Sequence, residues 1–385
     1  MVGREQLIQR LELELEELQQ KQRKRKLQPT LGVDFTSNDY LGLANSSSLK
    51  ARVLSALSQS DMPLGAGGSR LLRGNHQWHE QVEKDFAEYE NTESVLYFTS
   101  GYAANMAVFT ALPTRHDVII FDSLVHASIR EGIHASFAQK KSFAHNSLES
   151  LAAATKNFPG AKNIYVVVES LYSMDGDESP LKEIASFCSR NDFLLIVDEA
   201  HATGIFGREG RGLIDEQDVR ENIFLSVHPC GKALGSAGAF VCSSDLIKQY
   251  FINRARTMIF TTALPPIIAF QLSEVIREIK LHPELIERVH KNTTFVRTTL
   301  QEGLQQWKIL PGRSPIVPLI IGSDEAACAV ALELQEKNID VRPIRPPTVA
   351  EGTSRFRMTI SAIHRQDQLE LLCESILSAE KRYIL

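Results

Sequence analysis

A lysine among small residues is the sharpest chemical signal in the sequence. Lys232 lies in the segment Gly-Lys-Ala-Leu-Gly at 231–235, directly after a strand-like run at 223–227. A partly desolvated lysine has a lowered pKa and can attack a carbonyl carbon and later carry a proton. Small neighbours let a flat ligand approach the backbone. Most lysines are solvated surface residues, so this motif indicates chemistry only in combination with others.

A carboxylate and an imidazole supply that combination. Residues 194–201 read Leu-Leu-Ile-Val-Asp-Glu-Ala-His, which predicts a buried strand ending at Asp198, with His201 three residues later. A carboxylate there can pair with a protonated ring nitrogen, and the imidazole can donate to a ring oxygen. The structural alternative for Asp198 is a helix N-cap. Asp-Glu-Ala-His also occurs in one helicase class, but the phosphate loop G-x-x-x-x-G-K-[ST] that such proteins need is missing from the sequence.

Further polar segments follow other predicted strands. Residues 98–105 predict a strand, a glycine turn and a helix start, where free N–H groups can hold phosphate. His126 follows the next strand and can stack on a ring, and the polar loop 169–177 follows another. Arg355 and Arg357 would share one face of a strand and could pair with a carboxylate. Each segment alone also has a purely structural interpretation. The two polar loops can be ordinary turns, His126 a hydrogen-bonded structural histidine, and the arginines part of a surface ion pair.

The elements that must position these residues follow an α/β pattern. Short runs rich in β-branched or aromatic residues alternate with segments long enough for crossover helices, which predicts a mostly parallel sheet. Functional groups in such folds gather at the carboxyl ends of the strands. The predicted strands are Ser94–Phe98, Val118–Phe121, Ile164–Glu169, Leu194–Val197 and Ala239–Cys242.

Three parts are expected along the chain. Residues 1–45 form an N-terminal helix and arm, 46–265 a large domain, and 266–385 a long helical stretch and a smaller α/β domain. Leucines at helical spacing predict an amphipathic helix from residue 4 to about 20, which we expect to pack on the smaller domain. The basic run 21–26 is interpreted as a solvated helix end, in preference to a patch for an acidic partner.

Composition excludes several classes. The 385 residues are 43% hydrophobic and 23% charged with a net charge of −5, which does not favour nucleic-acid binding. Five scattered cysteines without a C-x-x-C spacing predict neither disulfides nor a metal site, and a reducing cytoplasm fits them best. We find no signal peptide and no apolar run long enough for a membrane span.

Taken together and in order, these segments resemble the α-oxoamine synthases, a fold-type I family of pyridoxal 5′-phosphate (PLP) transferases. Two more segments carry the resemblance, Asn-Asp-Tyr-Leu-Gly-Leu at 38–43 and Gly-Ala-Gly-Gly-Ser-Arg at 65–70. The likeness runs from about Phe35 to the C-terminus. It implies a homodimer with shared active sites and a large domain built on a mostly parallel sheet.

The resemblance also implies roles. Lys232 would carry PLP as a Schiff base and move the substrate proton, so that Lys232, His126, Asp198 and His201 are the expected catalytic residues. On the ring, Asp198 would contact the pyridine nitrogen and His201 the phenolic oxygen, while His126 would stack on the ring face with Ser173 nearby. Gly101 and Tyr102 would bind the phosphate, together with Thr262 of a second subunit. Arg357 and Asn38 would bind the substrate.

The segment 344–355 favours one branch of the family. Its residues resemble the members that serve biotin biosynthesis by condensing L-alanine with a pimeloyl thioester, carried on CoA or on acyl carrier protein. Two alternatives remain open, a glycine-using member and a PLP-binding homologue that has lost catalysis.

Two departures from the family pattern stand out. The family usually has a threonine or serine three residues before the lysine, whose hydroxyl helps to bind phosphate, but this chain has Pro229. Proline offers neither a hydroxyl nor an N–H, so His228 is a candidate replacement. The segment before Asn38 is also short, which leaves the substrate role of an N-terminal arginine, Arg23 or Arg25, open.

We predict that Pro229→Thr tightens PLP binding about tenfold, because a hydrogen bond to a charged phosphate contributes about 1.5–3 kcal/mol. Losing the proline acts on folding rather than on cofactor affinity and costs only about 0.4–1 kcal/mol. If His228 binds the phosphate instead, His228→Ala should weaken PLP binding. Cofactor dissociation constants of the parent and both variants test this, and three equal values would contradict both explanations.

Overall fold

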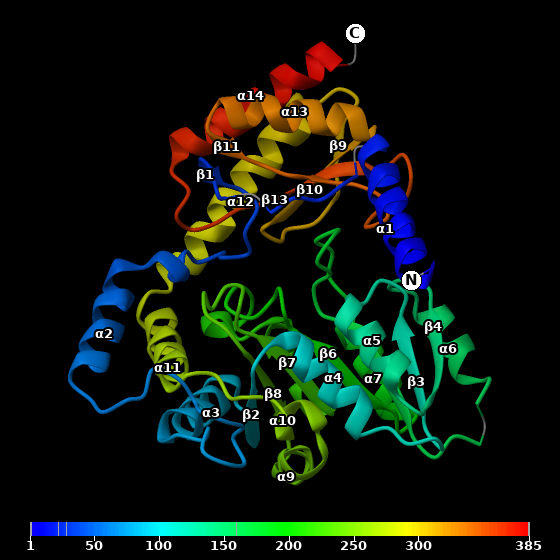
Figure 1. The fold of residues 1–385 in the computed structure, drawn as a ribbon, viewed down its shortest axis with the longest axis vertical. Coiled ribbons are helices and arrows are strands. Elements are labelled where there is room, and N and C mark those ends of the chain that lie inside the picture. Colours follow the sequence, from blue (N-terminus) through cyan, green and yellow to red (C-terminus); the bar gives the residue numbers. More distant parts are fainter. Residues whose placement is uncertain (1, 22, 28, 159, 384–385) are drawn as a thin grey trace.

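A seven-stranded sheet forms the centre of the large domain in the computed structural model, which describes residues 2–21, 23–27, 29–158 and 160–383. The strand order is β2-β8-β7-β6-β5-β3-β4 (Figure 1). β8 is antiparallel to both neighbours, and every other pair is parallel. The strands are β2 Ser94–Phe98, β3 Val118–Asp122, β4 Gln139–Phe143, β5 Ile164–Glu169, β6 Leu194–Asp198, β7 Leu225–Pro229 and β8 Ala239–Ser243.

Alternation along the strands gives this sheet two buried faces. On β5, Val166 and Val168 belong to one apolar cluster and Tyr165 and Val167 to another. The first cluster includes residues of α3, α6, α7 and α11, and the second includes residues of α4, α5, α9 and α10. The helices are α2 Ser47–Ser58, α3 Gln77–Glu90, α4 Gly101–Ala111, α5 Ala127–Ala135, α6 Leu148–Thr155, α7 Leu181–Arg190, α8 Leu213–Glu216, α9 Asp245–Arg254, α10 Arg256–Ile259 and α11 Pro266–Leu281.

A second, smaller layer of strands and helices lies across the ends of the large sheet (Figure 1). Its four antiparallel strands have the order β12-β13-β10-β9, and a separate parallel pair joins β1 to β11. Phe35 packs in its core with side chains of the C-terminal helices. The elements are β1 Val33–Asp34, α12 Glu284–Gly303, β9 Lys308–Ile309, β10 Ile316–Gly322, α13 Asp324–Glu336, β11 Ile339–Asp340, β12 Pro343–Ile344, β13 Ser354–Thr359 and α14 Gln366–Tyr383.

The five predicted strands are confirmed to within one residue at their ends, whereas the strand-like run at 223–227 corresponds to β7, which begins and ends two residues later. The long helical stretch predicted after residue 265 consists of two helices, α11 and α12, because the chain turns at His282 and Pro283. β4 was not predicted from the sequence, because its Gln-Lys-Lys-Ser-Phe segment is mostly exposed at the edge of the sheet and lacks apolar alternation. α11 contributes to the large core, so the domain boundary at residue 265 stays a prediction.

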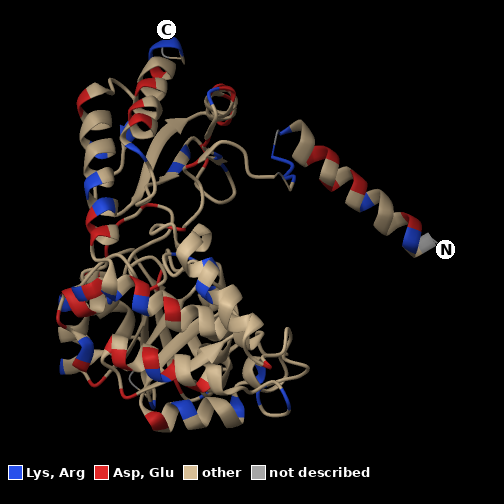
Figure 2. Cartoon of the chain, turned by 90° about the vertical axis from the view of Figure 1, so that its left-hand side faces the viewer, with Lys and Arg blue, Asp and Glu red and all other residues tan. Residues whose placement is uncertain are grey.

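The expectation that the N-terminal helix packs on the smaller domain is wrong. α1 (Val2–Gln20) stands away from the rest of the chain (Figure 2). Leu7, Leu11, Leu15 and Leu18 on its apolar face are 40–48% exposed. Its leucines alternate with glutamates and glutamines, so the pattern predicts the helix but not a partner within the chain. Among the described residues, no helix is long and apolar enough to cross a bilayer.

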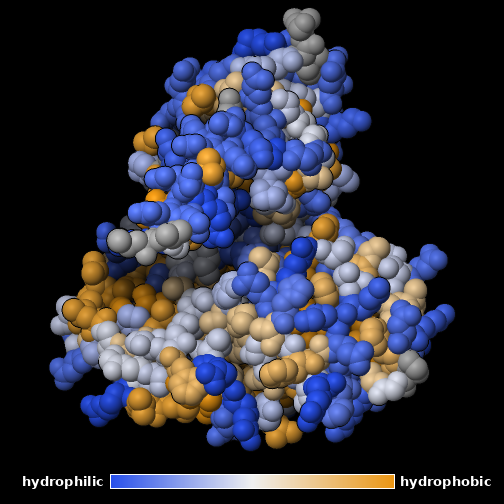
Figure 3. All heavy atoms as spheres, turned by 45° about the vertical axis from the view of Figure 1, so that its right-hand side comes forward, coloured by the Kyte–Doolittle hydropathy of each residue, from blue (hydrophilic) through white to orange (hydrophobic). Residues whose placement is uncertain are grey.

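A loop after β5 ties the two layers together. On the large-domain side, His145 bonds to Asp122 Oδ1 at 2.9 Å and to Asp177 Oδ2 at 2.7 Å. On the other side, Asp175 pairs with Arg355 of β13. The surface is hollowed between the upper and lower parts of the molecule (Figure 3). The loop therefore holds the smaller layer over the carboxyl ends of the large sheet.

We predict that His145→Gln destabilises the protein by about 2 kcal/mol near neutral pH, because two hydrogen bonds to charged groups are lost. Burial alone would lower the pKa of His145, but the bonds to Asp122 and Asp177 raise it to about 10. A raised pKa stabilises the fold fully below the ordinary value of 6.5, and this contribution disappears as the pH rises towards 10.

Urea unfolding of both proteins at about pH 6 and about pH 9 should therefore show a smaller difference at the higher pH. The exposed His116 offers a matched control, because His116→Gln should leave the midpoint unchanged. A difference that grows with pH would contradict the ion-pair explanation.

Candidate active site

Polar residues from many parts of the chain line one cavity at the carboxyl ends of the parallel strands. Its volume is about 390 Å³. A larger hollow of about 620 Å³ lies at the opposite ends of β6 and β7. The smaller cavity is therefore identified as the candidate site by the polar residues that line it, not by its volume. The lining residues that matter below are Asn38, Gly101, Tyr102, Asn105, His126, Glu169, Asp198, His201, Pro229 and Lys232.

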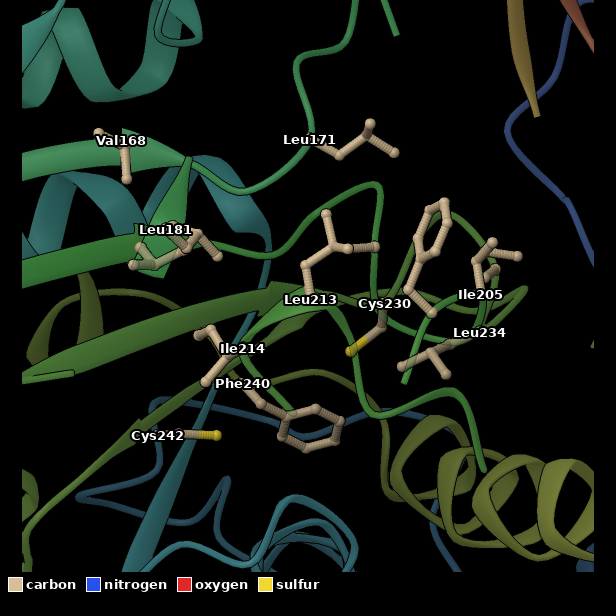
Figure 4. Packing of buried hydrophobic residues seen from close by; sticks show 14 of the residues in the cluster. Val168, Leu171, Leu181, Ile205, Leu213, Ile214, Cys230, Leu234, Phe240 and Cys242 are labelled. Carbon is tan, nitrogen blue, oxygen red and sulfur yellow. The ribbon is translucent and has the colours of Figure 1, made fainter. Parts of the chain in front are cut away.

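Lys232 lies on the turn that follows β7, and its neighbours hold it in place. Cys230 and Leu234, two residues to either side, are buried in the apolar cluster that also contains Phe240 and Ile205 (Figure 4). Gly235 has a φ of +56°, and a Cβ there would come within 2.5 Å of the Ala44 nitrogen, so this turn requires glycine. Burial lowers the pKa of Lys232. Among the described residues, its Nζ has no hydrogen-bond or ion-pair partner, which leaves it available for chemistry.

Asp198 ends β6 and is 4% exposed. Its Oδ2 accepts from Asn105 Nδ2 at 2.9 Å, and its Oδ1 accepts from the backbone N–H of Ala200 at 2.9 Å. No helix begins here, so Asp198 is not an N-cap. Asn105 was not predicted as a site residue, because it lies in the middle of α4 and its role depends on how that helix packs on the sheet.

His126 and Glu169 form one wall of the cavity. His126 caps α5, its Nδ1 lies 2.8 Å from Ser128 Oγ, and its backbone N–H donates to Glu169. Burial lowers the pKa of His126, and burial beside Asp198 raises the pKa of Glu169 to about 8. Both side chains are therefore largely neutral near pH 7. Glu169, at the end of β5, was also missed as a site residue.

His201 lies three residues after Asp198 and is 4% exposed. Its Nδ1 is 2.7 Å from the hydroxyl of Tyr40, a fully buried residue of the 38–43 segment. Burial, together with Lys232, Arg357 and His126, lowers the pKa of His201 well below its usual value. The imidazole is therefore neutral, and its tautomer depends on Tyr40.

The start of α4 forms another part of the wall, as predicted from 98–105. Ser100 caps the helix by accepting from Ala103 N at 3.0 Å, which leaves the N–H groups of Gly101 and Tyr102 towards the cavity. Pro229 packs against this start, because a Cβ on Gly101 would lie 2.8 Å from Pro229 Cγ.

The suggestion that His228 replaces the missing hydroxyl is wrong. His228 is fully buried, its Nδ1 lies 2.8 Å from Thr203 Oγ1, and its Nε2 lies 2.8 Å from Ser226 Oγ. Side chains alternate along β7, so His228 faces away from the neighbouring Pro229 and the start of α4. Both ring nitrogens are occupied, and neither can reach a phosphate at the helix start.

Arg357 of β13 lies next to the cavity: it bonds to Asn38, a lining residue, but is not itself among the lining residues. Its Nη2 donates to Asn38 Oδ1 at 2.9 Å, and its Nε donates to the carbonyl of Ser173. Arg355 reaches the same loop at Asp175, so the prediction that the two arginines share a face is confirmed. Ser173 contacts Arg357 through its backbone, and the cavity lining does not include its side chain.

Two predicted regions lie away from the cavity. Thr262 is exposed and is not among the lining residues, so its role on a second subunit stays a prediction. Arg23 pairs with Asp324 at 3.0 Å and with Glu351 at 2.8 Å, which anchors the N-terminal arm to the smaller layer. Arg25 contacts Thr348 Oγ1 at 3.3 Å. Among the described residues, no cluster of three or more His, Cys, Asp or Glu could hold a metal ion.

Comparison with known proteins agrees with this geometry. Residues 31–376 match the family model described as aminotransferase class I and II. The chain belongs to the aminotransferase class I and II family. A relative within the family, 8-amino-7-oxononanoate synthase from Marinobacter nauticus, is 37% identical over 369 residues, which cover 93% of this chain and 91% of that protein.

Two solved structures have the same fold as this aminotransferase family member. Serine palmitoyltransferase from S. paucimobilis, with PLP and myriocin bound, has a TM-score of 0.88 at 27% identity and covers 97% of both chains. The 8-amino-7-oxononanoate synthase of Francisella tularensis has a TM-score of 0.77 at 28% identity and covers 92% of this chain and 99% of its own. The fold-type I architecture expected from the sequence is therefore confirmed.

We predict that borohydride reduction of the PLP-loaded protein attaches a pyridoxyl group to Lys232, because this is the one lysine with a lowered pKa in the cavity. Peptide mapping by mass spectrometry locates the label. Lys232→Ala should abolish it, whereas Lys248→Ala, at a lysine that pairs with Glu83, should not. A label on another lysine in the parent protein would overturn the assignment.

Proposed function

We propose that this chain is an 8-amino-7-oxononanoate synthase, which condenses L-alanine with a pimeloyl thioester in biotin biosynthesis. The observation that carries the proposal is the convergence of Lys232, Asp198 and His201 in one cavity, beside the Arg357–Asn38 pair. The M. nauticus relative of that name supports it, since the similarity spans nearly the whole chain.

PLP fits these residues in charge and in donor chemistry. The N–H groups at the start of α4 suit its phosphate, Asp198 suits a protonated pyridine nitrogen, and the flat imidazole of His126 suits a ring face. When bound, PLP supplies an electron sink for a carbanion at the substrate's α-carbon. Asp198, oriented by Asn105, would supply the carboxylate that pairs with the protonated ring nitrogen.

Lys232 removes the α-proton of alanine in this proposal. Burial lowers the pKa of Lys232, so a larger fraction of its amine is neutral near pH 7 and can accept a proton. The same amine can return a proton to that carbon later in the reaction.

Arg357 and Asn38 bind the carboxylate of alanine. The bonds from Arg357 to Ser173, Thr359 and Asn38 use three of its five N–H groups. The remaining two are available for a charge-assisted contact with a carboxylate.

The atoms of the overall reaction balance without another reagent. A carbon–carbon bond forms between the α-carbon of alanine and the thioester carbonyl, and the thiol leaves with the electron pair of the carbon–sulfur bond and a proton. The alanine carboxylate then leaves as carbon dioxide, and a proton takes its place. The acyl group arrives on CoA or on an acyl carrier protein.

We also infer a cytoplasmic homodimer with shared active sites. Leu71, Leu72 and Phe260 are large apolar side chains 48–80% exposed on the large domain. The Ala263 N–H donates to the Gly68 carbonyl at 2.9 Å, which ties the segment of Thr262 to that of the leucines. Covering this surface with a second copy would bury apolar area and bring Thr262 to the other subunit's phosphate. All five cysteines are free, which suits a reducing compartment.

A product assay tests the proposed reaction. Mass spectrometry should detect 8-amino-7-oxononanoate from L-alanine and pimeloyl-CoA, and glycine should be a poor substitute for alanine. Asp198→Asn should lower turnover by a factor of about 100 or more, because an amide cannot stabilise the protonated ring nitrogen. Asp192→Asn, a matched change in an exposed turn, should leave turnover unchanged.

The other outcomes separate the alternatives. A preference for glycine over alanine would identify a glycine-using relative. Bound PLP without product from either amino acid would identify a homologue that has lost catalysis.

A further inference from the structure

Tyr40 lies behind the cavity and contacts two of the groups that line it. The side chain is fully buried, and its hydroxyl is 2.7 Å from His201 Nδ1 and 3.3 Å from Asn38 Oδ1. A tyrosine hydroxyl has one proton, so it can donate fully to only one of these atoms. The choice decides which nitrogen of His201 carries a proton.

Two arrangements are possible. If Tyr40 donates to His201, Nδ1 accepts, and the neutral ring carries its proton on Nε2. If Tyr40 donates to Asn38, the Nδ1–H of His201 donates to Tyr40, and Nε2 is an acceptor. The orientation of Asn38 is not free, because Arg357 Nη2 can only donate and must face Oδ1, at 2.9 Å.

The distances and surroundings favour the first arrangement. The contact with His201 is shorter by 0.6 Å than the contact with Asn38, and Asn38 Oδ1 already accepts from Arg357. Burial raises the pKa of Tyr40, so it keeps its proton. Burial and nearby cations keep His201 neutral, so one of its nitrogens must be an acceptor.

We propose that Tyr40 is a positioning residue that holds His201 as the tautomer with its proton on Nε2, so that the imidazole presents a hydrogen-bond donor to the cavity. With Nδ1 occupied by Tyr40, Nε2 is the nitrogen available to a ligand. The group it would meet is the phenolic oxygen of PLP, an acceptor. This inference rests on the PLP site proposed above.

A double-mutant cycle on cofactor affinity tests the proposal. Tyr40→Phe keeps the shape of the side chain and removes the donor, and it should weaken PLP binding about three- to tenfold, the range expected for one neutral hydrogen bond. In the His201→Ala background the same change should have no further effect, because Tyr40 acts through His201. PLP dissociation constants of the four proteins give the coupling.

A matched control separates this role from general packing. Tyr89 is also fully buried, and its hydroxyl donates to the carbonyl of Glu209 at 2.8 Å, away from the cavity. Tyr89→Phe should leave PLP affinity unchanged. The absorption maximum of bound PLP should shift in Tyr40→Phe and not in Tyr89→Phe, because only the former alters the donor to the phenolic oxygen.

Each other outcome overturns the proposal. Tighter PLP binding by Tyr40→Phe would mean that Tyr40 accepts from His201 in the parent. Equal losses in both backgrounds, or no loss in either, would mean that Tyr40 does not act through His201. If the parent protein fails to bind PLP at all, the proposed function fails together with this inference. If the parent binds PLP and Lys232 is labelled, but the cycle gives one of the outcomes above, only the inference fails.

Discussion

The site depends on keeping one carboxylate oriented inside the protein. Burying Asp198 without partners would cost several kcal/mol, so the fold must supply donors to both of its oxygens. Asn105 and the backbone of Ala200 do so. Asn105 belongs to α4, the helix whose first N–H groups face the same cavity. One helix, packed across the end of β6, therefore positions both the carboxylate and the anion-binding groups.

Burial then shifts the pKa values of the other ionisable groups in the cavity. It lowers the pKa of Lys232, His126 and His201 and raises the pKa of Glu169 to about 8. His126, His201 and Glu169 are therefore largely uncharged near neutral pH, and a larger fraction of the Lys232 amine is neutral than in an exposed lysine. Arg357 adds a guanidinium next to the cavity, through Asn38, which suits a ligand that carries a carboxylate.

The smaller layer completes the site because Arg357 is not part of the large sheet. β13 brings it to Asn38 of the cavity lining, and the loop after β5 holds that strand through Arg355 and Arg357. His145 secures the other side of the loop. The side of the cavity next to Arg357 is thus built from both layers, whereas the side with Lys232 and Asp198 is built from the large one.

The sequence by itself determined the ends of the strands and the groups that follow them, because buried strands are short apolar runs and their carboxyl ends collect polar residues. Lys232, Asp198, His201 and His126 were found in this way. The tertiary structure alone decided which residues form hydrogen bonds to these side chains. Asn105 is 93 residues from Asp198, and Tyr40 is 161 residues from His201. No periodicity relates such partners, since packing rather than spacing brings them together. Packing likewise decided that His228 faces away from the cavity and that α1 has no partner within the part of the chain that the structure describes.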